Sequence, residues 1–339
     1  MAISTDRRSG ASASGSSAAP PSPSPSTVPS RRRRGHGDHS PARRGRWVIY
    51  LMLIPGIIQL VLFKLLPVGA LTIAFQEYSP FLGLLQSPFV GFEQFARFVA
   101  DPDLPRLVRN TLLLSAGTLL VSFPVPILFA LLLNEVRVRM LRRFTQTLTF
   151  VPYFISSAVL VSIVYSLLSP QGGLVNEVIK AFGGTPVYFM TEPGWFRPIY
   201  IIMSTWQTFG YSAIIYTAAL SNIDQSLYEA AEVDGAGRWR KMWHITLPAL
   251  RPMIIVMWIL AIGQVLTVDL DKILLMYNPS VYETADVVQS FVYRQAFAAN
   301  GFPNYSYAAA VGLIQGVLAL VLILSTNSAA KRLEGSGLF

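Results

Sequence analysis

The sequence predicts an all-α, polytopic membrane protein with six transmembrane helices. Hydrophobic residues make up 52% of the 339 residues and charged residues only 13%, about half of their usual share in soluble domains. Five long stretches contain no Asp, Glu, Lys or Arg: 110–134, 144–176, 198–223, 252–268 and 295–330. A helix that crosses a bilayer needs about 20 apolar residues and tolerates unpaired charge poorly, so these stretches indicate membrane spans.

Residues 1–46 form a basic tail ahead of the spans. They contain nine Arg against two acidic residues, Asp6 and Asp38, so most of the net charge of +9 lies here. Ser, Ala, Pro and Gly dominate the tail, which predicts a disordered cytoplasmic segment. Beside a membrane domain, anionic membrane lipid is the favoured partner of such a tail, and nucleic acid is not. An organelle transit peptide, also rich in Arg and Ser, is the competing interpretation.

The first two predicted spans contain prolines that should disturb them. The first covers 47–75, and we expect its helix to break near Pro67, because proline lacks a backbone N–H and its ring clashes with the preceding turn. The second covers 110–134, about 37 Å of helix, with an expected kink at Pro124 and Pro126.

Four further predicted spans follow, at 149–168, 198–220, 252–273 and 307–327. The six spans define a transmembrane domain over 47–330, and 331–339 form a short C-terminal segment.

The distribution of Lys and Arg orients these spans. With the N-terminus inside, the inner segments carry the nine Arg of the tail, four basic residues each in 135–148 and 221–251, and two more at Lys331 and Arg332. The outer segments carry only six. Both termini and the segment 221–251 are therefore predicted to be cytoplasmic.

The inner segment between the fourth and fifth spans has the local chemistry of a helix, a turn and a second helix. Ser226 followed three residues later by Glu229 matches a capping box, which predicts the start of a short helix. Gly235 can adopt the left-handed conformation that ends it. We expect a second short helix over 238–245 that ends before Pro248.

The local chemistry leaves the role of this loop open. The small side chains of Ala230 and Ala231 would let the backbone of another protein approach closely, which favours a docking surface. A capped connector with no partner fits the same residues.

The loop resembles the EAA loop of importer-type ABC transporter permeases. The match begins with Glu229-Ala230-Ala231, and Gly235 follows after a spacer of three residues that ends with Asp234. Ile245 follows Gly235 after nine residues, and Leu247-Pro248 follow Ile245 after one residue. Four other stretches resemble the carbohydrate-uptake permeases of this family: 134–136, 151–154, 215–220 and 306–313. Residues 75–78 and 291–294 resemble the branch that handles oligosaccharides derived from complex polysaccharides.

This resemblance implies a permease of the type I ABC importer kind in a bacterial cell membrane, whose six spans form one half of a pore. It implies three protein partners: a cytoplasmic ATPase dimer that binds ATP and Mg²⁺, a second permease subunit and an extracytoplasmic solute-binding protein. The coupling loop would cover 226–248. The residues that would couple it to the ATPase are Glu229, Ala230, Ala231, Asp234, Gly235, Ile245, Leu247 and Pro248.

The chain itself lacks the signature of an ATPase. A phosphate-binding loop needs a Gly-Lys pair before Ser or Thr, and none of the five Lys residues follows a Gly. The absence of Cys and the presence of only three His leave little for a metal centre. We therefore predict a transporter subunit that has no enzymatic activity and no cofactor or metal of its own.

Polar residues within the predicted spans are candidates for a sugar path. They are Gln207, Tyr211, Gln264, Asp269 and Gln315, which offer the amide, carboxylate and aromatic groups that sugars bind. Polar groups in spans usually face a water-filled path or the interior of the bundle. Each of them could instead make a hydrogen bond between helices.

Three other function classes stay open. A permease for a non-sugar solute fits the same loop. An ion-coupled carrier would favour more spans and inverted repeats. A membrane-embedded sugar transferase would need clustered acidic or His residues at one membrane face. The sequence does not identify the sugar, the role of the tail, or whether two identical or two related chains form the pore.

Overall fold

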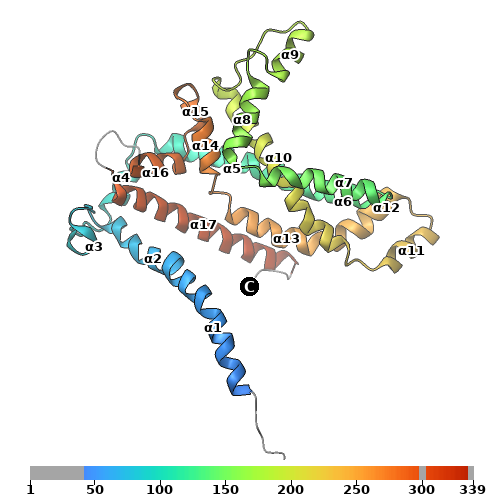
Figure 1. The fold of residues 1–339 in the computed structure, drawn as a ribbon, viewed down its shortest axis with the longest axis horizontal. Coiled ribbons are helices and arrows are strands. Elements are labelled where there is room, and N and C mark those ends of the chain that lie inside the picture. Colours follow the sequence, from blue (N-terminus) through green and yellow to red (C-terminus); the bar gives the residue numbers. More distant parts are fainter. Residues whose placement is uncertain (1–41, 298–302, 335–339) are drawn as a thin grey trace, which may run out of the picture. The chain divides into compact units, whose positions relative to one another are not determined.

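The computed structural model describes residues 42–297 and 303–334 (Figure 1). The described residues are helical, with one isolated antiparallel bridge between Gln76 and Phe89 and no strand, which confirms the all-α class. The chain divides into two units, 1–58 and 59–339, and the first is described only by the start of α1 (Ala42–Leu60). Most of the predicted basic tail lies outside the described residues.

The first span is one continuous helix over Tyr50–Phe75, so the predicted break at Pro67 is wrong. α1 passes into a π-helical turn η1 (Val61–Leu65), then α2 (Leu66–Ala70) and a 3₁₀ turn η2 (Leu71–Phe75). In the π turn the Leu66 N–H bonds the Val61 carbonyl, five residues back. Pro67 therefore stands in the first turn of α2, where a missing N–H is tolerated.

The second span covers Leu104–Asn134. It consists of α5 (Leu104–Ser122) and α6 (Pro124–Asn134), and the helix is interrupted at Phe123, where the prolines predicted a disturbance. Two short helices, α3 (Gly83–Gln86) and α4 (Glu93–Val99), precede it, in a segment that the Lys and Arg counts predict to be on the outer side.

The third predicted span is not a straight helix. α7 (Arg139–Phe150) and the 3₁₀ turn η3 (Val151–Phe154) are followed by α8 (Ser157–Leu168) at an angle of 104°. Ile155 and Ser156 are extended between them, and the Ser156 hydroxyl accepts a bond from the Val159 N–H, which starts α8 afresh. The outer helix α9 (Leu174–Ala181) comes next.

The fourth span corresponds to α10 (Pro193–Leu220), a helix of 28 residues that packs against α5, α6, α7 and α13. It starts five residues before the predicted boundary. At Gly210 the absence of a side chain lets α10 lie directly on the backbone of Thr149 in α7.

The fifth span begins earlier and ends earlier than predicted. α11 (Gln225–Val233) is followed by α12 (Arg238–Lys241), a π turn η4 (Met242–Thr246) and α13 (Leu247–Gly263). Arg238–Gly263 is one continuous helix, so the expected end before Pro248 is wrong. As in the first span, a π turn precedes a Leu-Pro pair and places the proline in the first turn of the next segment.

The segment between the last two spans, which is predicted to be on the outer side, consists of short helices. They are α14 (Leu270–Met276), η5 (Pro279–Val281), α15 (Tyr282–Ala285) and α16 (Val288–Phe297). The last span lies within α17 (Tyr305–Glu334). By length and composition, four described helices could cross a membrane, or five with the bent pair α7–α8, and α10 is not among them. The count of six spans stays a prediction.

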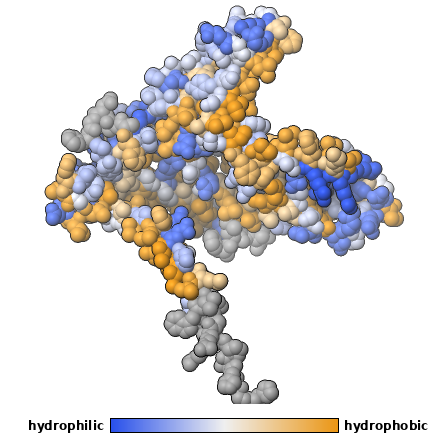
Figure 2. All heavy atoms as spheres, in the orientation of Figure 1, coloured by the Kyte–Doolittle hydropathy of each residue, from blue (hydrophilic) through white to orange (hydrophobic). Residues whose placement is uncertain are grey.

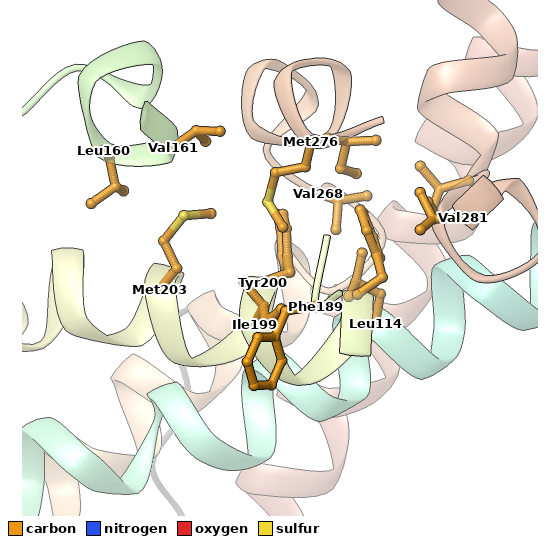
Figure 3. Packing of buried hydrophobic residues seen from close by; sticks show 14 residues of the cluster. Leu114, Leu160, Val161, Phe189, Ile199, Tyr200, Met203, Val268, Met276 and Val281 are labelled. Carbon is orange, nitrogen blue, oxygen red and sulfur yellow. The ribbon is translucent and has the colours of Figure 1, made fainter. Parts of the chain in front are cut away.

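Buried apolar side chains join the helices around α10. Figure 3 shows Tyr200 and Met203 of α10 with Leu114 of α5, Leu160 of α8 and Met276 of α14. A second buried cluster joins α6, α10 and α13, and a third joins α4, α5, α16 and α17. Figure 2 shows hydrophilic residues gathered over α11 and α12, at one end of the view.

The close contact at Gly210 gives a test of this packing. We expect Gly210→Ala to lower the stability of the purified protein by about 1–3 kcal/mol, because the new methyl group would fall on the Thr149 carbonyl, a backbone atom that cannot move aside. Thermal unfolding in detergent measures this. Gly312→Ala in α17, where a methyl group meets no atom within 4 Å, is the matched control. Equal unfolding temperatures for the two variants would contradict the packing.

Candidate functional site

The first candidate site is the inner loop, which we define as residues 224–248. Its first helix, α11, is capped by Asp224, whose Oδ1 accepts a bond from the Ser226 N–H at 2.9 Å. The predicted capping box at Ser226 and Glu229 is therefore wrong, because the helix starts two residues earlier and Ser226 already lies in its first turn. The bond from Ser226 lowers the pKa of the Asp224 carboxyl, which keeps a negative charge at the helix N-terminus.

The turn after α11 has the predicted form. Gly235 adopts a left-handed conformation with φ of 76°. Its N–H bonds the Glu232 carbonyl at 3.0 Å, and the Ala236 N–H bonds the Ala231 carbonyl at 2.8 Å. This pair of bonds is a Schellman motif, which satisfies the last carbonyls of the helix and reverses the chain into α12.

Two polar contacts hold α11 against the helix that follows. The hydroxyls of Tyr228 and Thr246 lie 2.9 Å apart, and Thr246 is only 2% exposed. At the surface, Lys241 Nζ contacts Glu232 Oε2 at 3.1 Å. The two short helices thus form one folded unit with the start of the fifth span.

The predicted coupling residues divide into an exposed set and a partly covered set. Exposed in the structure are Glu229, Ala230, Asp234, Gly235 and Pro248, and half-buried are Ala231, Ile245 and Leu247. The first set is accessible to a partner, whereas Leu247 packs into the cluster that joins α6, α10 and α13.

The loop also exposes large apolar side chains that the sequence reasoning did not select. Leu227 is 51% exposed and Val233 90%, and both belong to α11; Trp239 and Trp243 are 69% and 60% exposed. Apolar groups gathered on an otherwise hydrophilic surface are typical of a contact with another protein or with a membrane. The sequence itself indicates this feature, because it places four large apolar residues in a segment that is too polar to lie in lipid.

The second candidate site is a hollow among α5, α6, α10 and α13, with a volume of about 390 Å³. We call it the hydroxyl-lined hollow. Its polar lining consists of Ser115, Thr118, Ser122, Tyr200, Ser212, Tyr216, Gln264 and Thr267. The Ser115 Oγ is buried and has no hydrogen-bond partner within the described chain. Hydroxyl and amide groups around a cavity of this size are suited to a polar, uncharged or weakly charged ligand.

Among the predicted path residues, Gln264 lines this hollow and is exposed there. Gln207 is buried, and its Nε2 donates to the Ile155 carbonyl at 2.8 Å, which fixes the turn between α7 and α8. Tyr211 faces a different surface, where its ring stacks on Tyr153 with centroids 4.0 Å apart.

The other two predicted path residues also lie outside the hollow. Asp269 is not on the fifth span, because α13 ends at Gly263; it caps α14 and contacts Lys272 Nζ at 3.0 Å. Gln315 donates to the Leu266 carbonyl beside a separate, apolar pocket between α5 and α17. Both side chains thus have internal partners.

An ion-pair cluster fixes the outer helices. Asp286, 1% exposed at its side chain, contacts Arg294 Nη1 at 2.6 Å and Arg106 Nη2 at 3.1 Å, and accepts a bond from the Tyr277 hydroxyl. Burial works against the charge of Arg294, but the hydrogen bond and charge of Asp286 outweigh it and raise the pKa of the guanidinium. Burial and the Asp286 charge also raise the pKa of Tyr277. The cluster joins α5, α14, α15 and α16.

Within the described residues, no group of three or more His, Cys, Asp or Glu side chains is placed to hold a metal ion.

Comparison with known proteins gives consistent matches over most of the chain. The family model described as binding-protein-dependent transport system inner membrane component matches residues 122–335. The polygalacturonan/rhamnogalacturonan transport system permease protein YteP of Bacillus subtilis is 44% identical over 86% of this chain and 90% of its own length. Protein LplB of the same organism is 42% identical over 88% of this chain and 92% of its own length.

A solved structure matches equally far. A bacterial ABC transporter involved in the import of the acidic polysaccharide alginate contains a chain with a TM-score of 0.79 and 38% identity, covering 86% of this chain and 98% of that one. A bacterial alginate ABC transporter solved in complex with an alginate pentasaccharide-bound periplasmic protein contains a chain with the same TM-score and identity, covering 88% of this chain and 98% of that one.

The outer cluster gives a prediction for stability. We expect Asp286→Asn to destabilise the protein by about 3 kcal/mol, because it removes the buried carboxylate that Arg294 and Arg106 share; Arg106 still contacts Asp103, but Arg294 loses its counter-charge. Chemical or thermal unfolding in detergent measures the loss. Glu283→Gln, at an exposed position of the neighbouring α15, is the control and should change little. If Asp286→Asn lowers the stability no more than the control does, the ion-pair cluster does not hold these helices together.

Proposed function

This chain belongs to the family of binding-protein-dependent transport system inner membrane components, and on that premise we propose that it imports an oligosaccharide as one half of the pore of an ABC transporter. As a permease component it is a multi-pass protein of the inner membrane, and the ATPase of such importers is a separate subunit. The observation that carries the choice of substrate is the 44% identity, over 86% of the chain, to a permease for polygalacturonan and rhamnogalacturonan.

The hydroxyl-lined hollow supports a sugar substrate. Its polar groups come from two helices and a loop: Ser115, Thr118 and Ser122 of α5, Tyr200, Ser212 and Tyr216 of α10, and Gln264 and Thr267 after α13. Sugars need many hydrogen-bond partners of both kinds, and hydroxyls supply donor and acceptor in one group.

A second sugar-binding surface is formed by aromatic rings. Tyr211, 43% exposed, stacks between Tyr153 at 4.0 Å and Phe150 at 5.9 Å. The faces of sugar rings pack on such side chains, so we place Tyr211 on the substrate path as well. Gln207, Asp269 and Gln315 have internal partners and are better explained as structural.

The inner loop would dock the ATPase. Its exposed set, Glu229, Ala230, Asp234 and Gly235, lies on and directly after α11, and Leu227 and Val233 of the same helix offer apolar contacts. In this proposal the partner ATPase dimer binds ATP and Mg²⁺, and its closure pushes α11. Both chain termini and the loop would then be cytoplasmic, as the Lys and Arg counts predict.

Two further partners complete the assembly. A second permease chain would form the other half of the pore and cover the stripe of Val159, Ile163 and Leu167, which α8 exposes after its 104° turn. An extracytoplasmic binding protein would deliver the sugar to the outer helices, as the solved alginate importer complex suggests.

Uptake into proteoliposomes tests the substrate and the hollow together. With the full assembly, we expect import of oligosaccharides from polygalacturonan, rhamnogalacturonan or alginate in preference to a malto-oligosaccharide. We expect Gln264→Ala to raise the KM of the imported sugar about fivefold, the effect of one lost hydrogen bond. Gln315→Ala, outside the hollow, should leave the KM unchanged. If no sugar is imported, or if both variants behave as wild type, the proposed substrate or the proposed site is wrong.

Disruption of the inner loop tests the coupling. We expect Gly235→Pro to abolish uptake, because proline cannot adopt a φ of 76° and has no N–H for the Glu232 carbonyl. The ATPase should no longer co-purify, while the permease stays folded in detergent. Gly183→Pro, at a left-handed glycine of the outer loop after α9, controls for general damage by proline and should retain the ATPase. Normal uptake by Gly235→Pro would count against the docking role.

A further inference from the structure

The inner loop contains a shielded hydroxyl pair whose position suggests a role in transmission. Tyr228 lies in the middle of α11, and Thr246 is the last residue of the π turn η4. Their oxygens lie 2.9 Å apart, Tyr228 is half-buried and Thr246 is 2% exposed. The bond thus joins the helix that would dock the ATPase to the helix that becomes the fifth span (Figure 1).

The direction of this bond follows from the donors available. The Thr246 Oγ1 also contacts the Lys241 carbonyl at 3.4 Å, and a carbonyl can only accept. Since Thr246 has a single hydroxyl proton, donation to Lys241 leaves it as the acceptor for Tyr228. Removing the Tyr228 hydroxyl therefore removes the bond, and removing the Thr246 hydroxyl removes both bonds.

The Tyr228–Thr246 bond lies at the π turn, where the backbone hydrogen bonding of the long helix is interrupted. In η4 the Leu247 N–H reaches back five residues to Met242, and Pro248 has no N–H to donate. The helix therefore lacks one backbone bond at this point, and single π turns often occur at functional sites. The Thr246 hydroxyl and His244 Nδ1, 3.0 Å from the Arg240 carbonyl, supplement the backbone there.

One turn further along, the same helix enters the core. Leu250 is fully buried and packs in the cluster with Ile127 and Leu131 of α6 and Tyr216 and Leu220 of α10. Lys241 also contacts Glu232 across these helices, but Glu232 is 77% exposed and such a pair is worth little. A displacement of α11 can reach the core through Thr246, and also through Ile223, which directly precedes the loop and packs on the same cluster.

We propose that Tyr228 and Thr246 are positioning residues that carry the movement of the docked α11 across the π turn into α13. They touch neither sugar nor nucleotide. Without their bond, α11 can rotate about Gly235 and the resulting movement deforms only the π turn. ATP hydrolysis then no longer drives sugar transport. The inference rests on the proposed docking of the ATPase to the inner loop.

The test uses the complete assembly in proteoliposomes, with the sugar of the panel above that wild type imports fastest. We expect Tyr228→Phe and Thr246→Val each to import about fivefold less sugar per ATP hydrolysed, the scale of one lost hydrogen bond. The ATPase should co-purify with both at the wild-type ratio. The double variant should be no worse than Thr246→Val, because the two residues act through one contact.

Three controls separate this role from damage to the fold. Thr246→Ser keeps the hydroxyl and should restore coupling to within about twofold of wild type. Tyr188→Phe in the outer loop and Thr217→Val, whose hydroxyl bonds only back to the Ala213 carbonyl, should both stay coupled.

Two results would overturn the inference: wild-type sugar import per ATP in both single variants, or loss of the ATPase from Tyr228→Phe, which would make Tyr228 a docking contact. Failure of the proposed function looks different. In that case the ATPase would not bind the wild-type protein, or the Gly235→Pro variant would import sugar normally.

Discussion

A helix in lipid must satisfy its backbone hydrogen bonds internally, and each proline removes a donor from that network. The chain meets this constraint in different ways at different prolines. Before Pro67 and Pro248 a five-residue π turn lets the helix continue. At Pro124 the helix is interrupted at a single residue, Phe123, and near Pro152 it ends and restarts at 104°. The local structure at each proline therefore determines which helices are continuous and which are bent.

The continuous helix through Pro248 links the two candidate sites. It runs from Arg238 in the inner loop to Gly263, a length of 26 residues or about 39 Å. At the inner end it bonds α11 through Thr246, and directly after the outer end Gln264 lines the hydroxyl-lined hollow. Between them Leu250 and Met257 pack beside α10. In the proposed mechanism, a movement of the loop reaches the wall of the hollow along this helix, which contains the π turn and Pro252.

Local rules predicted where most of the long apolar helices lie and the turn at Gly235, because hydropathy and a left-handed glycine depend on few neighbours. They failed at Pro67 and Pro248, where the break they predict is avoided by a π turn that no local pattern marks. They chose Ser226 over Asp224 as the cap, although both residue types suit the position. The partners of Gln207 and Gln315 are carbonyls at Ile155 and Leu266, which only the fold brings near. The hydroxyls of the hollow are spread over distant segments and were missed for the same reason.

The central claim, that the inner loop is a cytoplasmic docking surface for an ATPase, can be measured directly because the chain has no cysteine. A single cysteine at Val233, which is 90% exposed, reports the loop, and one at Phe182 in the outer region, 89% exposed, reports the opposite side. In inside-out vesicles, a membrane-impermeant maleimide should modify Val233→Cys but not Phe182→Cys, and assembly with the ATPase should slow the first reaction at least tenfold. Modification of Val233→Cys at the same rate with and without the ATPase, or only from the outer side, would contradict the account.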